Sequence, residues 1–197
     1  AKRKPHRRPT AGPKSGLTVR RTADGRGWVF VHPRCARDRA EDIEDVRAMV
    51  EAGELDVAID ELRWLLSGCS EFIEAHELLG ELALAADNDV PLARGHFGFA
   101  VTLGLKTLKR AKANGPLPFK EPANRAFHEA GRGLVWCLAE LGMMPKAEEL
   151  VRDLLKLDPS DPLQLRALLD ERRTGGLPIV ELSPPNDRPD GDGDIDT

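Results

Sequence analysis

The stretch Gly142–Pro162, GMMPKAEELVRDLLKLDPSDP, decides the fold because periodicity and turn residues agree along its whole length. Pro145 stands where the first turn of a helix tolerates proline, and Asp158-Pro159 closes the run. The apolar side chains between these boundaries recur at helical spacing: Ala147, Leu150, Val151, Leu154 and Leu155. The stretch therefore predicts one amphipathic helix.

A second helical stripe, over residues 126–141, precedes this stretch, so residues 142–145 predict a tight joint between two antiparallel helices. A helical hairpin of this length cannot bury its apolar face alone, which predicts further copies. Apolar stripes with helical spacing do recur, over about residues 39–50, 55–68, 72–86, 90–108 and 161–173. We expect an insertion at about 105–122, with an irregular loop from about 113.

The last helix pair carries small and apolar residues in a fixed order: Leu134, Leu138, Gly142, Ala147, Val151, Leu154 and Pro159. An earlier pair offers Val46, Gly53, Ala58, Leu62 and Leu65, with Ser70 where a proline would complete the pattern. The pair between them offers Leu79-Gly80, Ala93, Phe97 and Ala100, without the glycine turn or the proline. These pairs resemble tetratricopeptide repeats, whose unit is a helix pair of about 34 residues with small residues at the crossing.

The key alanines of the three pairs are separated by 35 and 54 residues. The first spacing fits the repeat, and the second fits it with about 20 inserted residues, which segment 105–122 supplies. The resemblance implies an all-α fold, a short right-handed array of antiparallel helix pairs forming a TPR-like solenoid. A non-repeating helical bundle is the alternative.

The N-terminal part of the chain predicts a small β-hairpin. Residues 17–21 and 28–31 are β-prone and flank Asp24-Gly25, and we expect Trp28 and Phe30 to dock on the helices. The predicted organisation is a disordered basic arm over 1–16, the hairpin and its lead-in over 17–38, the helical domain over 39–173, and an acidic, mostly disordered tail over 174–197.

The net charge of −4 conceals a strong asymmetry. Residues 1–40 hold twelve Lys and Arg against two Asp, whereas residues 181–197 hold six Asp and Glu against one Arg. No segment approaches the roughly 20 apolar residues of a membrane span, so we expect a soluble, cytoplasmic protein without a membrane partner. Cys35, Cys69 and Cys137 form an odd set without C-x-x-C spacing, which predicts neither a disulfide framework nor a zinc site and favours a reducing compartment.

The sequence contains no motif of an enzyme active site. The patterns G-x-x-x-x-G-K-[ST], G-x-S-x-G and H-E-x-x-H are all absent, and His32 and Cys35 have no second pair of ligands at useful spacing. His76 and His96 lie about one repeat apart and could face one another, although packed or solvated histidines are commoner than catalytic ones. We therefore expect no enzymatic activity, no catalytic residue, no metal and no cofactor.

In tetratricopeptide arrays the first helix of each pair lines a concave groove. Transferred residue by residue, the resemblance implies these groove positions: Ile43, Arg47, Glu74, Glu77, Glu81, Glu129, Arg132, Trp136 and Glu140. An acidic groove with one tryptophan suits a basic or amphipathic peptide, unless Trp136 is simply part of the core. The sequence therefore predicts a non-enzymatic scaffold that binds a peptide or partner protein through its groove.

An alternative function rests on the cations. A flexible basic arm binds nucleic acid by charge without a fold, which suggests a nucleic-acid- or ribosome-associated protein. The candidate contacts are Lys2, Arg3, Lys4, Arg7, Arg8, Lys106, Lys109 and Arg110, with Lys112 beside them. Cations at a helix end also complement its dipole, and the arm could instead dock on the chain's own acidic groove or serve only as a tail. The sequence does not predict the oligomeric state.

Overall fold

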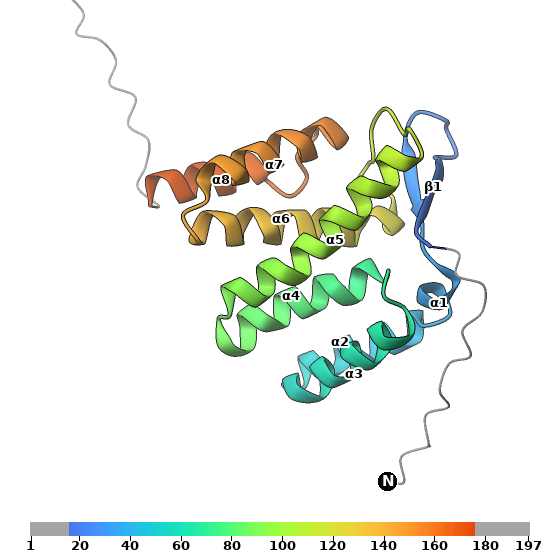
Figure 1. Ribbon diagram of the computed structural model, residues 1–197, viewed down its shortest axis with the longest axis vertical. Coiled ribbons are helices and arrows are strands. Elements are labelled where there is room, and N and C mark those ends of the chain that lie inside the picture. Colours follow the sequence, from blue (N-terminus) through green and yellow to red (C-terminus); the bar gives the residue numbers. More distant parts are fainter. Residues whose placement is uncertain (1–15, 176–197) are drawn as a thin grey trace, which may run out of the picture.

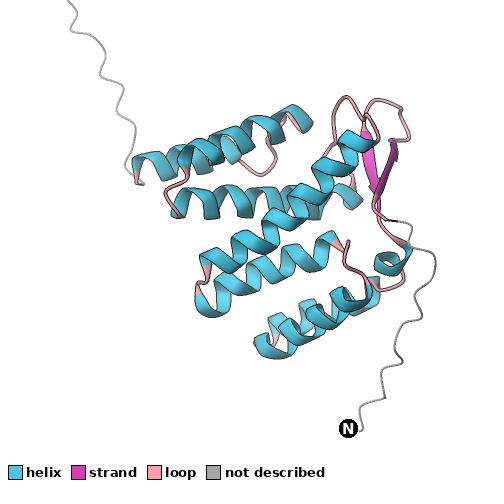
Figure 2. Cartoon of the chain, in the orientation of Figure 1, coloured by secondary structure: helices cyan, strands magenta, loops and turns pink. Residues whose placement is uncertain are grey.

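The structure, a computed structural model, describes residues 16–175 (Figure 1). Within this range the chain forms eight α-helices, one short 3₁₀-helix and a two-stranded antiparallel hairpin near its N-terminal end (Figure 2). The mostly helical fold and the hairpin are therefore confirmed. The predicted disorder of residues 1–15 and 176–197 lies outside the described residues. No helix in the described part of the chain is long and apolar enough to cross a membrane.

The hairpin consists of β1 (Thr18–Arg21) and β2 (Trp28–Val31), with Arg21 paired to Trp28 next to the turn. The helices follow in chain order: α1 Arg34–Arg37, α2 Ala40–Glu51, α3 Leu55–Gly68, α4 Ile73–Asp87, α5 Val90–Arg110, the 3₁₀-helix η1 Pro122–Asn124, α6 Arg125–Glu140, α7 Met144–Leu157 and α8 Leu165–Thr174. The last helix starts at Leu165, later than the sequence suggested, because the Asp161 carboxylate accepts the N–H of Leu165 and holds a turn there.

Short turns join the helices that the sequence paired. Gly53 and Gly142 adopt positive φ angles of 77° and 70° between α2 and α3 and between α6 and α7, which explains glycine at both positions. The side chain of Asp89 caps α5 by accepting the N–H of Leu92 at 2.9 Å. The predicted crossing alanines Ala58, Ala93 and Ala147 are all fully buried.

Helix α5 corrects the expected insertion at residues 105–122. The helix continues to Arg110, so residues 105–110 are helical and the irregular segment is confined to about 111–121. Buried contacts explain the extension: Leu108 is buried, and Gly104 lies so close to the ring of Phe127 that an added Cβ would be 2.4 Å from it. These contacts hold the last turns of α5 against α6.

Phe97 of α5 brings three helices together. Its ring lies between Gly80 of α4 and Gly133 of α6, and a Cβ added at these glycines would approach the ring to 2.5 Å and 2.6 Å. Helix α4 also contacts α6 directly, so α4, α5 and α6 form the centre of the molecule. Only glycine permits this approach without displacing a buried aromatic ring.

Asn124 attaches the hairpin to the helices. Its Oδ1 accepts the N–H of Phe30 at 2.9 Å, and its Nδ2 donates to the carbonyls of Trp28 at 3.1 Å and Pro118 at 3.0 Å. The ring of Phe30 is buried 5.4 Å from that of Phe127, and Trp28 Nε1 donates to the carbonyl of Asn114. The expected docking of Trp28 and Phe30 is therefore confirmed, and the hairpin lies beside one end of α5 (Figure 1).

A disulfide joins Cys35 in α1 to Cys69 after α3, while Cys137 is free and buried. The prediction of no disulfide was wrong. The two cysteines are 34 residues apart and belong to no spacing motif, but packing of α1 against the first helix pair brings their Cα atoms to 5.7 Å. The cysteine-based argument for a reducing compartment therefore no longer holds.

Gly80→Ala should destabilise the protein by about 1–3 kcal/mol, because the new methyl group must displace the buried ring of Phe97. Gly95→Ala is the matched control: Gly95 is exposed in the same layer of helices with nothing within 4 Å, and the change should stabilise by about 0.5–1 kcal/mol. Urea unfolding of both variants measures the difference. Equal effects of the two substitutions would contradict close packing of the Phe97 ring against Gly80.

Cys35→Ser should lower the free energy of unfolding by about 2–4 kcal/mol, because it removes a crosslink that closes a long loop of the unfolded chain. Because Cys35 is exposed, the substitution should have little effect on packing of the core. Thermal melts with and without a reductant provide the control. Reductant should lower the melting temperature of the wild type but leave that of Cys35→Ser unchanged, and an equal response of both proteins would exclude the disulfide.

Candidate partner-binding surface

Five of the predicted groove residues meet on one surface of helices α2, α4 and α6. We call this surface the acidic face, and it comprises Arg47, Glu74, Glu77, Glu81 and Glu129. The carboxylates of α4 share one side because they are three and four residues apart. Arg47 Nη2 of α2 donates to Glu74 Oε1 at 2.8 Å, and Glu129 of α6 is close enough to raise the pKa of Glu77.

Glu77 is the most unusual residue of the acidic face, with only 3% of its surface exposed. Burial, together with the charge and hydrogen bond of Glu81 and the charge of Glu129, raises the pKa of Glu77 far above its usual range, against a weaker opposing effect of Arg47. Glu77 therefore holds its proton at neutral pH and shares a hydrogen bond with Glu81. Burial and Glu81 also raise the pKa of Glu129.

The one cation of the acidic face is already engaged. Arg47 forms its ion pair with Glu74. In the described part of the chain, neither Glu81 nor Glu129 has an ion pair, although Glu81 is exposed and Glu129 half-buried. Glu81 and Glu129 therefore have no ion-pair partner in the described structure, and the charge of Glu81 repels that of Glu129.

The remaining groove candidates do not join the acidic face. Ile43 is buried in the core between α2 and α3, so its assignment to a groove was wrong. Arg172 of α8 lies 5.2 Å from the ring of half-buried Trp136 and forms an ion pair with Glu140. Helix α8 therefore covers this end of α6, and Trp136 packs against the larger core, as the alternative interpretation allowed.

Arg132 lines a shallow cavity of about 310 Å³ between α6 and α8. The other lining residues come mostly from α8 and the turn before it: Pro162, Leu163, Gln164, Ala167, Leu168 and Glu171. Neither the position of α8 nor this cavity follows from the sequence pattern, because the pattern fixes which face of a helix is apolar but not which neighbour covers it.

His76 of α4 and His96 of α5 face one another, an arrangement that the sequence allowed. Their Nδ1 atoms are 3.5 Å apart, and the ring of Phe99 lies 4.2 Å from that of His76. Burial lowers the pKa of His76 to about 4, so its ring is neutral at pH 7. Within residues 16–175 there is no group of three or more His, Cys, Asp or Glu side chains placed to hold a metal ion.

The candidate nucleic-acid contacts Lys106, Lys109 and Arg110 are exposed near the C-terminal end of α5. Arg110 Nη2 donates to the carbonyl of Leu17 at 2.7 Å, so this end of α5 lies beside the hairpin. The sequence did not place the cations of the hairpin near this end of α5, because their position depends on how the hairpin docks. Lys2, Arg3, Lys4, Arg7 and Arg8 lie outside the described residues.

Comparison with known proteins identifies no relative: no protein-family model, curated protein or solved structure matches this chain. The tetratricopeptide resemblance thus remains a prediction from the residues of the chain. A functional assignment must rest on the geometry described above.

The pKa of Glu77 predicts that stability falls as pH rises. An unfolded glutamate has a pKa near 4.5, so between this value and the raised folded-state pKa the folded protein holds a proton that the unfolded chain releases. This contribution to stability is complete below about pH 4.5 and is lost as pH rises through the folded-state pKa, by at most about 1.4 kcal/mol per pH unit.

Glu77→Gln tests this because glutamine keeps the shape and offers an amide N–H donor in place of the carboxyl O–H, without an ionisable group. Urea unfolding at pH 5.5 and 8.5 should show that the variant gains stability relative to the wild type as pH rises. Glu51→Gln, at an exposed position of α2, is the control and should follow the wild type at both pH values. A constant difference between Glu77→Gln and the wild type would contradict the raised pKa.

Proposed function

We propose that this protein is a non-enzymatic interaction scaffold that binds a basic segment of a partner protein on the acidic face. The observation that carries this proposal is the buried carboxyl of Glu77 beside Glu81 and Glu129, which have no ion pair in the described structure. A surface that gathers carboxylates around a buried acid is destabilising by itself, and a bound cation relieves that cost.

We further propose that the helix pairs form a TPR-like array. Three fully buried alanines at the helix crossings support this, as does the contact of α4 with both α5 and α6. The Arg47–Glu74 ion pair and the proximity of Glu129 to Glu81 support a common surface for the first helices of successive pairs. Such a surface would be the groove that the repeat uses to bind extended or helical peptides.

The chemistry of the acidic face defines the partner. A Lys or Arg side chain placed between Glu81 and Glu129 would attract both carboxylates and would lower the pKa of Glu77. Long cationic side chains can also cover apolar surface with their methylene groups while the charge reaches the carboxylates. We therefore expect a Lys- or Arg-containing segment as the partner.

The triple variant Glu74→Gln/Glu77→Gln/Glu81→Gln tests this proposal. Peptides of about 12 residues that alternate Lys or Arg with Leu serve as probes, and matched Glu-Leu peptides serve as negative probes. Fluorescence anisotropy should show binding of the cationic peptides to the wild type, with affinity at least about tenfold weaker in the triple variant. The fold should be retained or slightly stabilised, since like charges are removed.

The control replaces the same number of acidic side chains elsewhere, at exposed positions of α2, α3 and α7: Glu51→Gln/Asp56→Asn/Glu149→Gln. It removes at least as much negative charge as the triple variant, because Glu77 is protonated at neutral pH. This variant should bind the cationic peptides as the wild type does. A peptide with the sequence of residues 1–15 is a further probe, and its binding would identify the chain's own arm as an occupant of the acidic face. Equal affinities of the two triple variants would show that the acidic face is only a solvated surface.

A further inference from the structure

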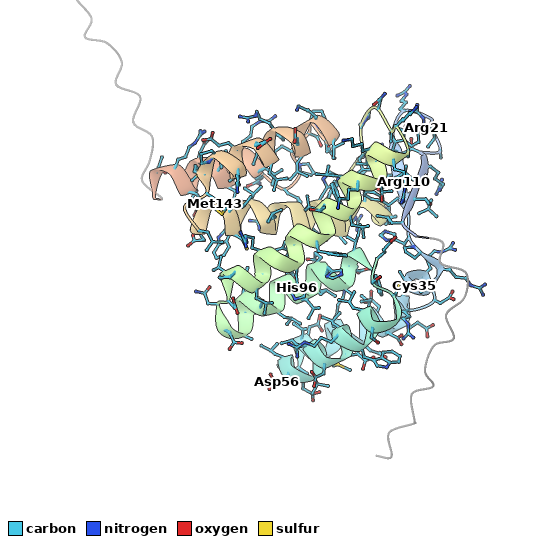
Figure 3. The ribbon with its side chains drawn as sticks, in the orientation of Figure 1. Arg21, Cys35, Asp56, His96, Arg110 and Met143 are labelled. Carbon is cyan, nitrogen blue, oxygen red and sulfur yellow. A yellow bond between two sulfur atoms is a disulfide. The ribbon has the colours of Figure 1, made fainter. Side chains whose placement is uncertain are left out.

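A second charged surface lies where the hairpin meets the C-terminal end of α5. We call it the basic end and define it by eight exposed side chains: Arg20, Arg21, Arg26, Lys106, Lys109, Arg110, Lys112 and Lys120. Figure 3 shows Arg21 and Arg110 at the same end of the molecule, although they are far apart in the sequence. The surface is therefore a product of the fold, assembled from three separate segments.

Specific contacts hold these segments together. The guanidinium of Arg110 donates to the carbonyl of Leu17, and the indole of Trp28 donates to the carbonyl of Asn114 in the segment after α5. The guanidinium of Arg21 lies 4.2 Å above the ring of Trp28. A hydrogen bond from Thr22 and, more weakly, the charge of Lys120 lower the pKa of Asp24, so the hairpin turn also lies near this segment.

The cations of the basic end are uncompensated. Within the described structure none of the eight forms an ion pair, whereas eight cations elsewhere do: Arg34, Arg39, Arg47, Arg63, Lys156, Arg166, Arg172 and Arg173. Residues 90–120 contain no Asp or Glu, and the hairpin contributes only Asp24. The dipole of α5 accounts for cations in its last turn, but not for Arg20, Arg26 or Lys120 on other elements.

We propose that the basic end binds the phosphate backbone of a nucleic acid without reading its sequence. Clustered Lys and Arg side chains on one end of an otherwise acidic protein are the electrostatic signature of such binding. The surface presents side chains from a hairpin and a helix C-terminus, with no helix placed to enter a groove, which favours backbone contacts.

The apolar surface argues against a membrane as the partner. Peripheral membrane binding combines cations with apolar side chains that enter the lipid boundary. The exposed large apolar residues of the described structure are Val57, Leu92, Phe99 and Leu141, none of which belongs to the basic end. Trp28 is half-buried and covered by Arg21. The surface therefore has charge for phosphates but no apolar anchor.

The variant Arg26→Gln/Lys109→Gln/Lys120→Gln tests this proposal on the full chain. These side chains come from three different segments and make no side-chain hydrogen bond within the described structure. Fluorescence anisotropy with an RNA of about 20 nucleotides and a DNA duplex of about 20 base pairs, at about 50 mM salt, measures binding. We expect the variant to bind at least about tenfold more weakly, with a salt dependence shallower by about two to three counterions.

The control Arg37→Gln/Lys146→Gln/Arg152→Gln removes the same charge from exposed positions outside the basic end and should bind as the wild type does. Circular dichroism and melting temperature verify folding of both variants. Equal losses of nucleic-acid affinity in the two variants would show that only the net charge of the protein matters. Unchanged affinity in the basic-end variant would assign any binding to residues 1–15. Tighter binding to vesicles containing phosphatidylserine than to either nucleic acid, or no nucleic-acid binding by the wild type, would likewise overturn the proposal.

Discussion

The close approach of α4, α5 and α6 around Phe97 is the constraint on which both candidate surfaces depend. The ring occupies space that a Cβ at Gly80 or Gly133 would take, so two glycines on different helices set the distance between the helices. This contact brings Glu129 of α6 near the carboxylates of α4. It also fixes α5 as the element that extends from the helical centre to the hairpin. Packing of small residues therefore determines where the charged residues lie.

A second set of contacts fixes the hairpin and the segment after α5 against the helices at the basic end. Asn124 binds β2 and the segment after α5 at once, and His128 Nε2 lies 2.7 Å from the carbonyl of Leu117 in the same segment. Both residues are buried, so breaking these hydrogen bonds would leave buried polar groups without a partner, at a desolvation cost. The irregular segment of about residues 111–121 is thus held in place by side chains of η1 and α6. The cations on and around this segment therefore have defined positions.

Local pattern predicted the helices, the hairpin and the burial of Ala58, Ala93 and Ala147, because each depends on spacing within one element. The row of Glu74, Glu77 and Glu81 was predictable for the same reason. Which carboxylate is buried, and which meets Arg47, depends on the angle between α2, α4 and α6, and a single sequence does not encode that angle in any local pattern. The Cys35–Cys69 disulfide escaped prediction because it joins elements through tertiary packing alone.

The helical structure of residues 105–110 and the covering of Trp136 by α8 have a common physical origin. Residues 105–110 were assigned to an insertion, but their helix is stabilised by contact of Gly104 with Phe127, which lies beyond the loop. Likewise, the apolar and aromatic surface of Trp136 is covered by Arg172 of a helix whose docking site the pattern leaves open. In both cases a long-range contact decides the role of a residue whose local signal is ambiguous.

The distribution of ion pairs separates charges that are neutralised within their own helix from charges that have no ion-pair partner in the described structure. On α1, α3 and α7 the pairs join residues three or four apart, so they neutralise their own helices locally and contribute little to stability. The acidic face and the basic end lack such local neutralisation, although oppositely charged residues are abundant in the chain. Helical spacing would have allowed local partners at both places, so their absence from the described ion pairs leaves two surfaces of opposite charge on one rigid group of helices. Under the two proposals, long-range electrostatics would draw cationic segments to the acidic face and phosphates to the basic end, and each surface would repel the ligand of the other.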